Sequence, residues 1–161
     1  MPLSISRAVK ILHVVGAEFS VEELAAKLGV LPKTARRYAM DLVRMGFVVE
    51  RSGNKFAVTD KGLFLLESSS VKERQVGDRE AYVFTDENGV PIPLKVSSIE
   101  KLYIAVKHGL IPENILRLHL EKGYLAKWVA EQLSAKLLAE RLTSVKTVEQ
   151  LVKLLEEYLA S

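Results

Sequence analysis

The chain has 161 residues, of which 48% are hydrophobic and 27% are charged, and its formal net charge is +3. This composition is typical of a folded globular protein and excludes long disordered regions. The lack of cysteine excludes disulfides, thiolate zinc sites and iron–sulfur clusters. No apolar run is long enough to cross a bilayer and no secretory leader opens the sequence, so we expect a cytoplasmic protein without membrane contact.

The excess positive charge lies in the first part of the chain. Residues 1–70 contain ten Lys and Arg against seven Asp and Glu, whereas residues 71–161 contain thirteen of each. A mostly charged stretch with few large apolar residues separates the two parts. We therefore expect a domain at residues 1–67, a linker at 68–80 and a second domain at 81–161. Abundant Lys and Glu with scarce Asn and Gln are typical of thermophile proteins, which suggests an archaeal, thermophilic source.

Three helices are expected first. Apolar residues at helical spacing predict a helix over about residues 4–15. Ser20 and Glu23 then form a capping box for a second helix. Gly29 is placed to end that helix in the left-handed conformation. A proline at the first helical position opens a third helix over residues 32–45.

This third helix has two different faces. At about 100° per residue, the face expected to pack carries Ala35, Tyr38, Ala39, Leu42 and Met45. The opposite face carries no acid, although Asp41 lies at its margin, and its residues are Lys33, Arg36, Arg37, Met40 and Arg44. Such a face can be a solvated surface or a binding surface for a polyanion.

A β-hairpin is expected after the third helix. Residues 47–58 form two short strand-like runs around a glycine-containing turn, with Arg51 and Lys55 at its tip. The segment Thr59-Asp60-Lys61-Gly62 then leads into a short apolar helix at residues 63–66.

These elements carry a resemblance to a known family. Over residues 4–67, the strings FSVEELAAKLGVLPKTARRYAMDLVRMGFVVER and FAVTDKGLFLLE resemble winged helix-turn-helix domains of MarR-like bacterial and archaeal transcription regulators. The resemblance implies that the helix at residues 32–45 enters the major groove of double-stranded DNA, where Arg36 and Arg37 suit guanine. The DNA-binding residues expected on this basis are Lys33, Thr34, Arg36, Arg37, Arg44, Arg51, Asn54 and Lys55.

Two features depart from the family pattern. Leu31 stands before the third helix where such proteins usually have Ser or Thr, which removes a helix cap and a phosphate contact. The expected wing is also short. Winged helices also serve as protein-docking modules, so a sequence-specific DNA-binding transcription regulator is the first hypothesis and a protein–protein interaction module in a larger assembly is the alternative.

The second part of the chain is expected to be mostly helical with one β-hairpin, giving an α+β protein overall. Asn88-Gly89 marks the hairpin turn, and Pro91 and Pro93 predict an edge strand. Helices are then expected at about residues 97–108, 124–133, 135–142 and 148–159, with 112–120 ambiguous between helix and strand. Their expected caps are Ser97, Ser134 and Thr147.

Residues 81–142 carry a weaker resemblance. The string LRLHLEKGYLAKWV after the hairpin resembles a small prokaryotic domain of unknown function with an aromatic-rich hairpin, a histidine, an aromatic residue and a tryptophan. His119, Tyr124 and Trp128 take those positions, and Gly123 replaces an acidic residue of the pattern. These three residues are expected either to contact a small effector or protein partner, or to belong to the core.

The last expected helix, at about residues 148–159, carries an apolar stripe. This stripe either packs on its own domain or forms a homodimer, as many DNA-reading winged helices do.

The sequence shows no known catalytic pattern. No phosphate-binding glycine loop, nucleophile elbow or HExxH pattern is present. We therefore expect no enzymatic activity, no catalytic residue, no cofactor and no metal.

Overall fold

The computed structural model describes residues 2–160 and has an α+β fold. Contacts divide the chain into two compact units, Met1–Leu66 and Glu67–Ser161, here called unit 1 and unit 2. Each unit has its own sheet, so each is described by itself. None of the helices within residues 2–160 is both long and apolar enough to cross a membrane.

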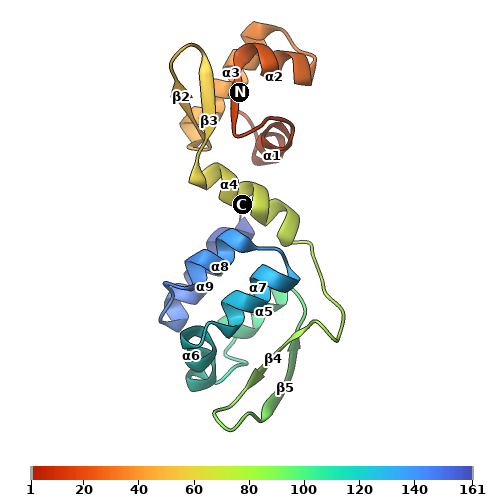
Figure 1. The fold of residues 1–161 in the computed structure, drawn as a ribbon, viewed down its shortest axis with the longest axis vertical. Coiled ribbons are helices and arrows are strands. Elements are labelled where there is room, and N and C mark those ends of the chain that lie inside the picture. Colours follow the sequence, from red (N-terminus) through yellow and green to blue (C-terminus); the bar gives the residue numbers. More distant parts are fainter. Residues whose placement is uncertain (1, 161) are drawn as a thin grey trace. The chain divides into compact units, whose positions relative to one another are not determined.

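Unit 1 contains three helices and a three-stranded antiparallel sheet (Figure 1). In chain order its elements are α1 (Ile5–Val14), β1 (Glu18–Ser20), α2 (Val21–Leu28), α3 (Pro32–Met45), β2 (Val48–Arg51), β3 (Lys55–Val58) and the first part of α4 (Asp60–Val71). The strand order is β1-β3-β2. Helices α1, α2 and α3 and the β2–β3 hairpin lie where the sequence predicts them, whereas β1 is an additional strand.

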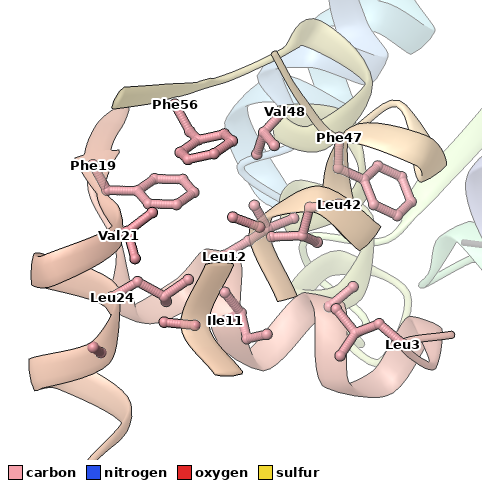
Figure 2. Packing of buried hydrophobic residues seen from close by; sticks show 14 of the residues in the cluster. Leu3, Ile11, Leu12, Phe19, Val21, Leu24, Leu42, Phe47, Val48 and Phe56 are labelled. Atoms are coloured by element: carbon pink, nitrogen blue, oxygen red, sulfur yellow. The ribbon is translucent and has the colours of Figure 1, made fainter. Parts of the chain in front are cut away.

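Strand β1 closes the sheet against the core. Phe19 pairs with Phe56 of β3, and their rings stack with centroids 5.6 Å apart. Figure 2 shows these rings above the side chains of α1, α2 and α3. Ala35 and Ala39 are fully buried on α3, and such small side chains let neighbouring elements approach α3 closely. The packed face predicted for this helix is confirmed at these positions.

The end of α3 is tied to the end of the hairpin. Gly46 ends α3 in the left-handed conformation, with φ 84°. Its carbonyl accepts the Thr59 hydroxyl at 2.6 Å, and the Phe47 carbonyl accepts the Thr59 amide at 2.9 Å. Lys61 Nζ donates to the Met45 carbonyl at 3.0 Å. These bonds explain the Thr-Asp-Lys-Gly segment: it fixes α3 relative to β2 and β3.

Unit 2 contains a two-stranded antiparallel sheet and a group of helices (Figure 1). Its elements are β4 (Tyr82–Thr85), β5 (Pro91–Val96), α5 (Ile99–Lys107), α6 (Glu113–Glu121), α7 (Tyr124–Gln132), α8 (Lys136–Leu142) and α9 (Val148–Ala160). The ambiguous segment at 112–120 is therefore helical. The cap of α5 is Ser98, not Ser97, because the Ser98 side chain accepts the Lys101 amide at 3.1 Å.

The start of α8 is capped by a residue distant in sequence. The amides of Leu137 and Leu138 donate to the Glu67 carboxylate at 2.8 and 3.0 Å. Ser134, the cap that the sequence predicted, has a left-handed backbone with φ 56° and precedes the helix without capping it. The same carboxylate accepts the Tyr158 hydroxyl at 2.9 Å. Glu67 therefore joins α4, α8 and α9 within unit 2.

The expected linker at residues 68–80 starts too early. Helix α4 continues to Val71, and both Ser68 and Val71 are buried. The expected short helix at 63–66 is correspondingly too short, because α4 starts at Asp60. Helix α4 extends past Leu66 because Glu67 caps α8 and accepts the Tyr158 hydroxyl, so the residues after Leu66 belong to unit 2.

The apolar stripe of α9 packs on its own unit. Leu151, Leu155 and Tyr158 are fully buried there, and α9 packs on α5. Burial raises the pKa of the Tyr158 phenol well above its ordinary value, as does the adjacent Glu67. The cap predicted for α9 is confirmed: the Thr147 side chain accepts the Gln150 amide, and the Gln150 side chain accepts the Thr147 amide. The buried part of this stripe therefore packs within unit 2.

Candidate nucleic-acid interface

Helices α2 and α3 form the helix-turn-helix part of the candidate interface. Gly29 ends α2 with φ 66°, in the left-handed conformation that the sequence predicts. Leu31 is the N-cap of α3 but makes no side-chain capping bond, and Pro32 occupies the first helical turn. The first backbone bond of α3 joins the Ala35 amide to the Leu31 carbonyl at 3.0 Å.

The exposed side of α3 carries the predicted cations. The cationic face is defined here as Lys33, Arg36, Arg37 and Arg44 with the half-buried Met40 between them. Together with Thr34, these residues line an open hollow of about 520 Å³. The hollow is a shallow surface along one helix, which suits contact with an extended partner better than enclosure of a small molecule.

Arg36 is held by the hairpin. Its Nη1 donates to the Asn54 side-chain oxygen at 2.8 Å, and its Nη2 lies 3.5 Å from a Glu50 carboxylate oxygen. This finding corrects the expectation that Arg36 and Asn54 are both free for DNA and that the cationic face meets no acid. The contacts also place the hairpin tip directly beside the middle of α3.

Arg44 is also paired with an acid. Its Nη2 lies 2.7 Å from a carboxylate oxygen of Asp41, whose side chain is only 10% exposed. Two of the four cations of the face are therefore paired, one with Glu50 of the hairpin and one with Asp41 at the margin of the face. Both arginines still expose about half or more of their side chains, 47% for Arg36 and 65% for Arg44. Glu50 is exposed as well, and an ion pair exposed on both sides stabilises a fold by about 0–1 kcal/mol, so an external anion competes readily with the pair of Arg36 and Glu50.

The other predicted cations form no ion pair in the part of the chain that is described. Lys33, Arg37, Arg51 and Lys55 are exposed. The guanidinium of Arg37 lies 5.4 Å from the centre of the Tyr38 ring. Residues 33–55 contain six Lys and Arg against two acids, which leaves a local charge of +4. The cationic face and the hairpin tip therefore remain strongly positive.

The hairpin tip has a tight turn. Arg51 pairs with Lys55 in the register, and the turn between them contains Gly53 with φ 71° and Asn54 with φ 60°. Asparagine tolerates the left-handed conformation better than most residues with a side chain. The turn thereby brings the Asn54 amide to Arg36. The hairpin is therefore short, and the bond between Asn54 and Arg36 holds its tip against α3.

No model of a known protein family, no curated protein and no solved structure matches the chain significantly. The resemblance to winged helix-turn-helix domains thus rests on the residues and on the observed order of elements.

The second group of predicted site residues lies in unit 2 around a buried histidine. His119 is 2% exposed. Its Nδ1 is hydrogen-bonded to the Tyr82 hydroxyl, and its Nε2 lies 3.0 Å from the Thr85 amide nitrogen and 2.8 Å from the Thr85 carbonyl oxygen. Burial, and secondly Tyr124, raise the pKa of Tyr82, so its phenol stays neutral. These contacts tie α6 to β4.

Trp128 and Tyr124 complete this aromatic cluster. Trp128 is 8% exposed, and its indole nitrogen donates to the Glu80 carbonyl at 2.6 Å. Tyr124 is 50% exposed and packs against the His119 ring, with centroids 5.5 Å apart. The polar ring atoms of His119 and Trp128 therefore form hydrogen bonds within unit 2, as the polar atoms of core residues do. Of the three, Tyr124 offers the most surface to an effector or partner.

Proposed function

We propose that the protein is a sequence-specific double-stranded DNA-binding transcription regulator that places α3 in the major groove. The B-DNA major groove is about 12 Å wide and accepts one α-helix. Lys33 and Arg37, near the start of α3, are exposed and free of acids among the described residues. Helix-turn-helix proteins contact base edges with this part of the recognition helix.

The observation that carries the proposal is the joint surface of α3 and the hairpin tip. The hydrogen bond from Arg36 to Asn54 brings the cationic face and the cations Arg51 and Lys55 together. In this proposal Arg37 reads a base, while Arg44, Arg51 and Lys55 bind phosphates and position the domain. Unit 2 then supplies dimerisation, or binding of an effector or partner.

A protein-docking role for unit 1 is the alternative. The ion pairs of Arg36 with Glu50 and of Arg44 with Asp41 favour it, because they reduce the charge available to phosphates. Selection from a random duplex pool distinguishes the two functions. A regulator enriches a common site, whose symmetry and half-site spacing also report the number of bound copies. A pool recovered without any shared sequence contradicts specific recognition.

The pair between Arg36 and Glu50 gives a further prediction. Replacing Glu50 with glutamine is expected to tighten duplex binding by about twofold to fivefold, because it frees an exposed guanidinium from a weak ion pair. Glu18→Gln is the matched control, since it removes one exposed charge from β1 of the same unit. Fluorescence anisotropy on the selected duplex measures both. Equal tightening in the two variants, or weaker binding by Glu50→Gln, contradicts a DNA role for Arg36.

A further inference from the structure

Leu31 is an exposed apolar residue directly before α3, the helix that carries the cationic face. It is 73% exposed, more than any other large hydrophobic residue in the described part of the chain. It is also the N-cap of α3, where it makes no capping bond. Ser, Thr, Asp or Asn at such a position would accept a helix amide and stabilise the helix. Leu31 therefore contributes neither a cap nor core packing in the free protein.

The neighbours of Leu31 indicate what it meets. Lys33 and Thr34, which line the hollow along α3, follow it within one helical turn. If α3 enters the major groove, its first turn faces base edges and flanking phosphates. Among the groups that the base pairs present there, the thymine C5-methyl is the one that an aliphatic side chain recognises.

We infer that Leu31 is a specificity-determining residue that contacts a thymine methyl group at the edge of the bound site. The inference rests on the proposed function and extends it to base identity. Contact with the methyl removes apolar surface of both partners from water. It gives preference for thymine over cytosine, and also over uracil, which differs from thymine in the methyl alone.

The test uses the full chain and the duplex selected from the random pool. Each thymine is replaced in turn by deoxyuridine, and binding is measured by fluorescence anisotropy. We expect one substitution, repeated in each half-site if the site is two-fold, to weaken wild-type binding by about fourfold, the equivalent of one buried methyl group. Leu31→Ser is expected to bind the thymine and uracil duplexes equally.

A control variant and a stability measurement separate this role from a structural one. Leu110→Ser changes another leucine, 55% exposed in unit 2, and should keep the preference for thymine. Leu31→Ser should raise the midpoint of thermal unfolding, because serine caps α3, so loss of the preference cannot be ascribed to unfolding.

The outcomes separate the inference about Leu31 from the proposed function on which it rests. Specific duplex binding without a uracil effect at any position, or a uracil effect that persists in Leu31→Ser, overturns the role of Leu31 while the regulator stands. Failure of the wild-type chain to select any duplex overturns both.

Discussion

Replacing Arg37 with alanine is expected to weaken binding to the selected duplex by about fivefold to 150-fold. The range corresponds to about 1–3 kcal/mol, the discrimination of one bidentate contact between a guanidinium and guanine. Arg37 is exposed and has no acidic partner within residues 2–160. Anisotropy titrations against single-base variants of the duplex should show relaxed preference at one base pair.

Arg7→Ala is the matched control for Arg37. The two guanidinium groups lie at similar distances from the centre of the Tyr38 ring, 5.6 Å for Arg7 and 5.4 Å for Arg37. A loss that came from packing on Tyr38 would therefore affect both variants. Equal losses in the two, or a loss by Arg37→Ala that is uniform over all sequences, would show that Arg37 does not read a base.

Replacing Gly62 with alanine is expected to lower the free energy of unfolding of unit 1 by about 1–3 kcal/mol, the usual cost of adding a methyl to a packed site. A Cβ at this position would lie 2.4 Å from the Phe47 carbonyl oxygen and 2.8 Å from Val58 Cγ1. The obstructing oxygen belongs to the backbone, so α4 or the start of β2 must shift. Urea unfolding followed by circular dichroism measures the change.

Gly16→Ala serves as the control for Gly62. Its added Cβ would meet the Glu18 carbonyl oxygen at 3.7 Å, an ordinary contact distance. We expect this variant to be as stable as the wild type. Because the Gly62 backbone packs where the end of α3 meets the hairpin, Gly62→Ala should also weaken duplex binding at temperatures where it is folded. A Gly62→Ala protein with wild-type stability would contradict the observed packing.

The local features of the fold could be predicted from the sequence. The bounds of α1, α2, α3 and α9 followed from apolar spacing, from Gly29 after α2, and from the Ser20 and Thr147 caps. These signals act over a few residues, so they do not depend on the rest of the chain.

The features that were missed depend on distant partners. Strand β1 has three residues, too few for a visible alternation, and exists because it pairs with β3. The cap of α8 comes from Glu67, seventy residues earlier in sequence than Leu137. No pattern around residue 134 could reveal a carboxylate that tertiary packing brings there.

In the candidate site, too, the local features could be predicted from the sequence and the contacts between elements could not. The positions of the cations on α3 followed from helical geometry. The bond from Arg36 to Asn54 joins two elements and required the structure. The pair of Asp41 and Arg44 is three residues apart on one helix. That spacing allows side-chain contact, so this ion pair could be expected from the sequence.

The central claim, that the cationic face and the hairpin tip bind the DNA backbone, is tested most directly by a salt titration. If about five phosphates are neutralised, a fourfold rise in salt concentration should weaken duplex binding by roughly 500-fold. Anisotropy at several salt concentrations gives this slope for the full chain. A steep linear fall of log affinity with log salt is the predicted result; duplex binding that is absent at low salt, or unchanged across the range, would contradict the account.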